Sequence, residues 1–320
     1  MLKICFTATL LLFTAVLFLN GCSNRMLNRM SDAVSGGGAS FIMNDDDPEF
    51  VAAALPTILK SLEGLIEANP THIGLRGAAA TGFSAFAYAF LHYNADTASD
   101  PLLRRHLLNR ARNMYIRARD YGLSALELRY PNFRTELAQN PQAALSRVTL
   151  RDADVLYWTG IAWMGAFTVD RANMRLALTV PQAKAILFRV AELNPDHGNG
   201  ALDEFFITFF ASMPASMGGD PERARYHFER ALQLSYGQSI SAYLNYVTAV
   251  SIPNQNGAEF DSLLSVAAQI RVDDWPDMRL LRVLQNRRVR HLRENRDLFI
   301  IPVPAVVSTA KEEEEAGEND

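Results

Sequence analysis

GDPERARYHFERALQL, residues 219–234, is the stretch of this 320-residue sequence that best predicts the fold. Asp220 followed by Pro221 marks a helix start, because an Asp side chain caps free backbone N–H groups and proline fits the first helical position. Ala224, Phe228 and Ala231 follow at a small–aromatic–small spacing along that helix. The small residues allow a neighbouring helix to approach closely while the ring fills the remaining gap.

The same spacing recurs elsewhere in the chain. Residues 111–118 carry it as Ala-x3-Tyr-x2-Ala, and residues 184–191 carry it more loosely as Lys-x3-Phe-x2-Ala. This spacing is typical of the second helix of tetratricopeptide repeats, although the intervals here are not a steady 34 residues. We therefore predict an all-α fold, a degenerate tetratricopeptide-like array of helical hairpins with insertions.

Further helix boundaries are indicated by Asp-Pro and Asn-Pro pairs, between which apolar residues recur every three or four positions. Alternation over strand lengths is absent. We expect the pairs at 69 and 194 to close helices and the others to open them. Pro56 lies inside the first apolar pattern, so we expect a break or kink there, with the main helix beginning near Leu55. The pairs are Asp47-Pro48, Asn69-Pro70, Asp100-Pro101, Asn140-Pro141, Asn194-Pro195 and Asp220-Pro221.

The N-terminus has the pattern of a secretory signal. Lys3 precedes an apolar run over residues 4–19, and Gly21 stands directly before Cys22. A cysteine after a small residue at the end of such a run indicates a lipobox, so we predict residues 1–21 as a signal peptide and Cys22 as the lipidation site. An ordinary signal peptide or a single membrane helix remains the alternative, although ~16 residues is short of the roughly 20 that span a bilayer.

A lipidated Cys22 would fix the location of the protein, because several acyl chains, such as palmitate, anchor a protein stably. Ser23 follows the cysteine in place of Asp, which favours sorting to the outer membrane. We expect an anchor in its periplasm-facing leaflet. Residues 22–47 are polar and predict a flexible linker, residues 48–300 a helical domain, and residues 301–320 a disordered acidic tail.

Composition and charge exclude several classes of protein. Cys5 and Cys22 are the two cysteines; one leaves with the signal and the other carries lipid, so no disulfide is expected. Net charge is −4, and residues 311–320 hold one Lys and six acidic residues, which leaves the predicted domain near neutral. A near-neutral domain argues against nucleic-acid binding.

No motif in the sequence predicts catalysis, a metal or a cofactor. The six histidines stand far apart, and neither HExxH nor a cysteine pair is present. The adjacent acids Asp152 with Asp154, and Asp203 with Glu204, are interpreted as charges at helix N-termini, not as an acid–base pair. His227 is expected at the surface or in a capping role. We predict a protein that is not an enzyme.

Two aromatic clusters are denser than packing requires. At helical spacing such rings usually form core, but some could line an apolar channel or ligand cavity on the concave face of an array. Adjacent phenylalanines cannot share one helix face, so one side of their helix faces a cavity or a partner, or the helix is buried all round. The candidates are Tyr157, Trp158, Trp163, Phe205, Phe206, Phe209 and Phe210.

The C-terminal helical pattern is rich in arginine. Arg287, Arg288 and Arg290 are candidates for contact with a partner protein or with anionic head groups. The alternative is a solvated outer face on a terminal capping helix.

Three segments together resemble one family: MYIRARDYGL at 114–123, DVLYWTGIAW at 154–163 and GGDPERARYHFERA at 218–231. The chain resembles the T component (TatT) of tripartite ATP-independent periplasmic (TRAP) transporters, over about residues 50–300. The resemblance implies a lipoprotein with a tetratricopeptide-like fold. Residues 202–217 depart most from the family pattern, because they are richer in Phe, which leaves the lining of any cavity open.

The resemblance also implies partners. These are the TRAP-type periplasmic substrate-binding protein, a small ligand, hydrophobic or polar, that passes through each protomer, and two further copies of the chain in a homotrimer. From another functional class, a scaffold that holds peptides or proteins during envelope assembly would use the same concave face. A continuous tunnel would favour transport, and a groove open along one side would favour the scaffold.

Overall fold

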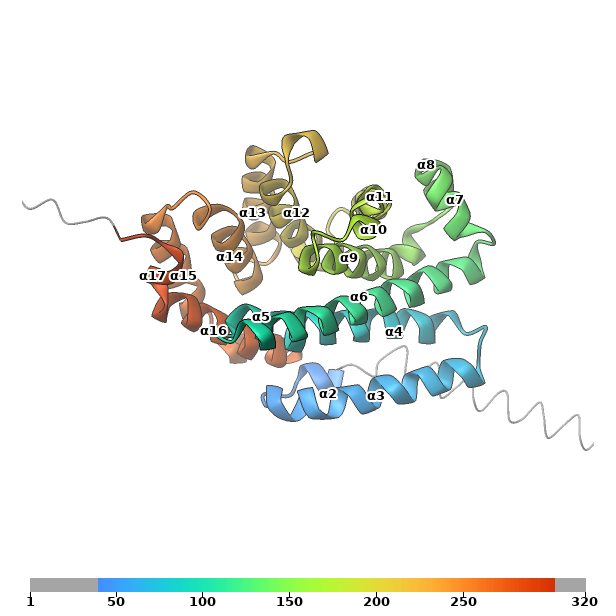
Figure 1. The fold of residues 1–320 in the computed structure, drawn as a ribbon, viewed down its shortest axis with the longest axis horizontal. Coiled ribbons are helices and arrows are strands. Elements are labelled where there is room, and N and C mark those ends of the chain that lie inside the picture. The colour runs from blue at the N-terminus through green and yellow to red at the C-terminus, as the bar shows by residue number, and fades with distance from the viewer. Residues whose placement is uncertain (1–39, 303–320) are drawn as a thin grey trace, which may run out of the picture.

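The computed structural model describes residues 40–302, and within this range every regular element is helical (Figure 1). The predicted all-α class is therefore confirmed. Cys22, the signal peptide and residues 303–320 lie outside the described residues. No helix between residues 40 and 302 is long and apolar enough to cross a bilayer.

An N-terminal arm, residues 40–193, consists of helices packed on one another (Figure 1). Helix α6 lies between α4 and α9, and α9 packs in turn on α11. The elements of this arm are α2 (Ser40–Met43), α3 (Pro48–Ala68), α4 (Ile73–Phe86), the π-helix η1 (Ala87–His92), α5 (Tyr93–Thr97), α6 (Pro101–Arg129), α7 (Phe133–Gln139), α8 (Pro141–Ser146), η2 (Leu150–Asp152), α9 (Ala153–Val169), α10 (Met174–Ala177) and α11 (Val180–Leu193).

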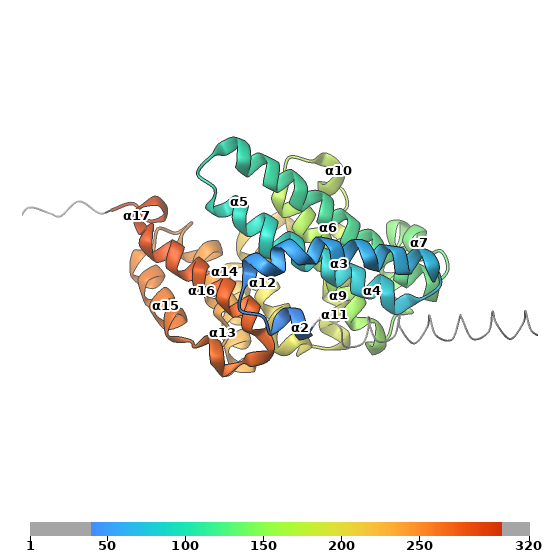
Figure 2. The same cartoon turned by 90° about the horizontal axis from the view of Figure 1, so that it is seen from below.

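A C-terminal arm, residues 197–300, begins with the paired helices α12 and α13 and returns toward α2 and α3 through α16 (Figure 2). Its elements are η3 (His197–Gly200), α12 (Ala201–Ser212), η4 (Ala215–Met217), α13 (Pro221–Leu234), α14 (Ile240–Tyr246), the π-helix η5 (Val247–Ser251), α15 (Gly257–Gln269), η6 (Val272–Asp274), η7 (Pro276–Met278), α16 (Arg279–Glu294) and α17 (Arg296–Phe299).

The predicted helix boundaries are confirmed at each Asp-Pro and Asn-Pro pair. Asp220 accepts hydrogen bonds from the backbone N–H groups of Glu222 and Arg223, so it caps α13. Asn69 and Asn194 close α3 and α11, as expected. Local capping chemistry therefore sets these boundaries independently of the rest of the fold.

The small–aromatic–small spacing also packs as predicted. Ala111 and Ala118 on α6, and Ala224 and Ala231 on α13, are fully buried. Between α6 and α9 the approach is so close that a Cβ on Gly122 would lie 2.0 Å from the Thr159 hydroxyl. A glycine is therefore required where these two helices touch.

The expected start of the main helix near Leu55 is wrong, because α3 begins at Pro48. Helix α3 runs unbroken through Pro56, because the proline lies on the exposed face and the Asp47 cap starts the helix earlier. The segment predicted as linker also contributes to the fold. Its short helix α2 packs on α16, and Ile42 contacts the core cluster formed mainly by α3, α4 and α6.

Candidate functional site

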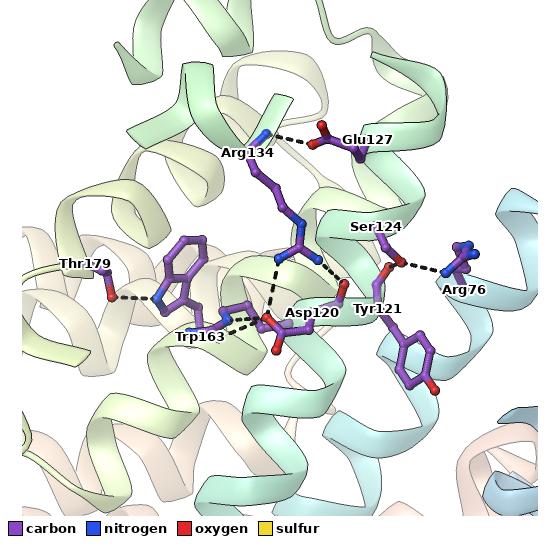
Figure 3. A network of polar contacts seen from close by, with 9 residues as sticks. Arg76, Asp120, Tyr121, Ser124, Glu127, Arg134, Trp163 and Thr179 are labelled. Carbon is purple, nitrogen blue, oxygen red and sulfur yellow. Dashed lines mark hydrogen bonds and ion pairs between the residues drawn. The ribbon is translucent and has the colours of Figure 1, made fainter. Parts of the chain in front are cut away.

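Most of the predicted aromatic candidates are core residues. Trp163, Phe206, Phe209 and Phe210 are all buried in one hydrophobic cluster. The indole N–H of Trp163 donates to the Thr179 hydroxyl at 2.9 Å, and this bond is seen in Figure 3 beside the arginine–aspartate contacts of α6. For these four residues the structure favours the core interpretation over a cavity lining.

The phenylalanines of α12 form the contact between the two arms. Phe188 on α11 lies edge-on to Phe206, Phe209 and Phe210, with ring centroids 5.1–6.2 Å apart. Arg223 from α13 lies over the Phe210 ring at 3.9 Å. We call Phe188 with Phe206, Phe209 and Phe210 the aromatic joint.

Tyr157, like Trp158 and Phe205, is only partly buried, and it differs from the buried candidates in contacting several polar groups. Its hydroxyl lies 3.5 Å from the carbonyl oxygen of Ala201, and its ring packs on His197 with centroids 4.6 Å apart. Burial raises the pKa of the Tyr157 phenol, and the nearby Glu204 and Tyr88 raise it further. The phenol therefore stays protonated and can donate a hydrogen bond. Trp158 packs edge-on against Tyr157.

Glu204 is the most perturbed carboxyl group beside Tyr157. Burial raises the pKa of Glu204 to about 7, although hydrogen bonds from Ser239 and Ser241 favour its charged form. Asn245 donates to the Glu204 backbone carbonyl at 3.1 Å, which ties α14 to α12. At neutral pH this carboxyl exists in both protonation states, so it can either accept or donate a hydrogen bond.

A third group of polar side chains comes from the π-helix η1. Tyr88 and His92 meet edge to face on η1, and His92 lies 3.4 Å from the hydroxyl of Tyr115. Burial lowers the pKa of His92, so its ring is held neutral. Short π-helical segments occur frequently at functional sites because they re-aim side chains out of the helical register.

We name Tyr88, His92, Tyr157 and Glu204 the inner polar cluster. Within this set, Tyr88, which is 40% exposed, packs edge-on against His92 on η1, and the Glu204 carboxyl raises the pKa of the Tyr157 phenol. The cluster offers phenol and imidazole groups together with a carboxyl group, that of Glu204, whose pKa burial raises to about 7. This set is suited to hydrogen-bonding a small polar or amphipathic molecule.

Sequence reasoning missed three members of this cluster. Glu204 was interpreted as a helix N-terminal charge, and Tyr88 and His92 were not singled out at all. The interpretation of Asp203 and His227 was also incomplete. Asp203 is buried and its Oδ1 lies 2.7 Å from Nδ1 of His227, whose ring stacks on Phe210, so His227 is neither a surface nor a capping residue.

The predicted arginine candidates divide into two kinds. Arg287 forms a bidentate pair with Glu49, and Arg288 lies 3.5 Å from Asp96, so both hold α16 on the N-terminal arm. These two residues serve the protein's own fold in this conformation. Arg290 is exposed and has no ion pair with any residue between 40 and 302.

The described residues contain no group of three His, Cys, Asp or Glu side chains placed to hold a metal ion. The acidic residues that stand close together in the sequence make separate contacts with other parts of the fold. Asp152, for example, is buried and accepts hydrogen bonds from Arg129 and Tyr130.

Comparison with known proteins adds two findings. The family model described as "TRAP transporter T-component" matches residues 44–299. An uncharacterized protein of Treponema pallidum (strain Nichols) is 33% identical over 263 residues, which covers 80% of this chain and 81% of the relative. The family match extends over nearly all of the described residues and therefore includes both arms.

Proposed function

The chain belongs to the TRAP transporter T-component family, and we propose that it docks a TRAP-type substrate-binding protein and assists the transfer of a small ligand. The observation that carries this proposal is the family match over residues 44–299, because it spans the whole helical array. Membership of a transporter-component family also favours a role without catalysis.

The proposed location follows from the N-terminal sequence. We propose that Cys22 is acylated and that the protein is anchored in the outer membrane facing the periplasm. Labelled palmitate should enter the wild-type protein in cells and be absent from Cys22→Ser. Incorporation into both proteins, or into neither, would contradict the anchor.

The inner polar cluster is the proposed point of ligand contact. Tyr157 and Glu204 lie next to the joint between the arms, where a ligand would reach groups from both. The ligand would be small and carry at least one hydrogen-bonding group beside any hydrophobic part, because displacing the present hydrogen-bond partners of Tyr157 and Glu204 by a wholly apolar molecule would leave these groups unsatisfied. Hydrophobic compounds with a carboxyl or hydroxyl group are therefore the first candidates.

The partner is tested by mixing the purified protein with a TRAP-type substrate-binding protein from the same organism. We expect a complex at micromolar concentration, detected by sedimentation velocity. The same measurement on the protein alone gives its mass, and a homotrimer is expected. Absence of a complex at these concentrations, together with an extended peptide recovered from the purified protein, would replace the transport proposal with the envelope-scaffold alternative.

A further inference from the structure

A hollow of about 600 Å³ lies on the surface formed by α15 and α16, away from the inner polar cluster. Val289, only 2% exposed, contributes its apolar part, and arginines contribute most of its charge. We call it the basic hollow. Its lining residues are Ala268, Asn286, Val289, Arg290, Arg293 and Glu294.

The two arginines of the basic hollow differ from their neighbours on α16. Arg287 and Arg288 of α16 each lie within 4 Å of a carboxylate, and buried Arg282 of the same helix donates to the backbone carbonyls of Arg271 and Gln238. Arg296, at the start of α17, also lies within 4 Å of a carboxylate. Arg290 and Arg293 are exposed and have no carboxylate within 4 Å among residues 40–302. Because they stand three positions apart, they present two unpaired guanidinium groups on one helix face. The hollow contains one acidic side chain, that of Glu294.

The chain leaves the described region at the N-terminal end of α15, where the Ile301 backbone N–H donates to the Gln255 side chain at 2.9 Å. Ala268 of the basic hollow lies near the other end of this 13-residue helix, about 20 Å along its axis. Ile300 is 3% exposed and packs in the same hydrophobic cluster as Val289 and Leu292 of α16. Eight residues, 303–310, then separate Pro302 from the acidic stretch 311–320, which holds six acidic residues and one lysine. A connection of this length reaches at most about 30 Å, so the acidic stretch can reach the hollow.

We propose that residues 311–320 dock in the basic hollow of their own chain. Opposite charge supplies the attraction, and tethering within reach of the site raises the effective concentration of the acidic stretch to about the millimolar range. Weak, salt-sensitive docking is thus sufficient to keep the hollow occupied at low ionic strength. The docked stretch would shield Arg290 and Arg293 from other anionic partners until one of them displaces it.

Trypsin cleavage after Lys311 in the full chain tests this proposal. We expect cleavage of wild-type protein to be about tenfold slower than cleavage of the double variant Arg290→Glu with Arg293→Glu at low salt. The difference should vanish in 0.5 M NaCl. The matched control is Arg104→Glu with Arg105→Glu, two exposed arginines of α6, and it should be cleaved like the wild type.

A second variant tests the other side of the contact without altering the hollow. Changing Glu313, Glu314, Glu315 and Glu318 to Gln keeps Glu312, so the residue after the cleaved bond is unchanged. This variant should lose protection to the same extent as the arginine variant. Equal cleavage rates for the wild type and both variants would overturn the proposal. The proposal would also be overturned if trypsin cleaved the wild type after Lys311 as fast as the variants while binding to anionic vesicles, or to an acidic partner protein, depended on Arg290 and Arg293.

Discussion

The two arms meet at two places that are built in opposite ways. At the aromatic joint, Phe188 packs against Phe206, Phe209 and Phe210 in a buried cluster. At the other contact, which we call the ionic latch, Arg287 pairs with Glu49, Arg288 with Asp96 and Arg279 with Asp46. Leu280 and Leu284 of α16 add apolar contacts beneath these pairs.

The two contacts are expected to contribute different free energies to the packing of the arms. Buried rings contribute several kcal/mol through burial and packing, whereas exposed ion pairs contribute at most about 1 kcal/mol each and weaken with salt. Two of the latch carboxylates, Asp46 and Glu49, are more than 60% exposed. The ion pairs of the latch should therefore contribute less than the joint, and the buried Leu280 and Leu284 supply the part of the latch that salt does not weaken.

The largest expected effect comes from emptying the joint. Phe210 is 1% exposed, and Phe210→Ala should lower the free energy of unfolding by about 3–5 kcal/mol. Urea denaturation followed by circular dichroism measures the change. Phe205→Ala is the control, because Phe205 is only partly buried and its substitution should lower the free energy of unfolding clearly less. Equal losses in the two variants would show that the joint does not hold the arms.

A smaller effect is expected at Glu204, which lies beside the joint and whose pKa is raised by burial to about 7. Ionisation therefore costs the folded state more than the unfolded state, so stability should decrease as pH rises from about 4.5 through 7. The full cost is about 3 kcal/mol by pH 8. Glu204→Gln removes this loss, so its free energy of unfolding should fall less than that of wild type between pH 5 and pH 8.

Urea titrations of wild type and Glu204→Gln at both pH values test this difference. Glu229→Gln, at an exposed position of α13, serves as the control and should keep the wild-type pH dependence. If the free energy of unfolding changed equally with pH in wild type and Glu204→Gln, Glu204 would be solvated. The inner polar cluster would then lack the electrostatic character assigned to it.

The smallest expected effect concerns the latch. Arg287→Ala should lower the free energy of unfolding by no more than about 1 kcal/mol at low salt, and 0.5 M NaCl should abolish the difference from wild type. Hydrogen exchange should nevertheless quicken in α2 and the first turns of α3. A salt-independent loss of about 3 kcal/mol would show that the latch is as firm as the joint.

Local chemistry made the helical array predictable. Asp220 and Asn69 act on backbone groups within four residues, and the alanines of α6 and α13 are buried wherever the small–aromatic–small spacing occurs. The expected helix start near Leu55 failed for a local reason as well. An exposed proline costs one hydrogen bond, which a well-capped helix of 21 residues tolerates.

The sequence by itself determined the helices, their boundaries and the array, because caps and 3.6-residue periodicity act within one or two turns. Tertiary structure alone decided the roles of the charged and aromatic residues. Arg287 and Arg290 are equivalent in the sequence, yet one pairs with a carboxylate 238 residues away and the other remains exposed. Likewise, Glu204 has its raised pKa only because α14 and α9 pack around it, and that burial depends on contacts between residues distant in the sequence.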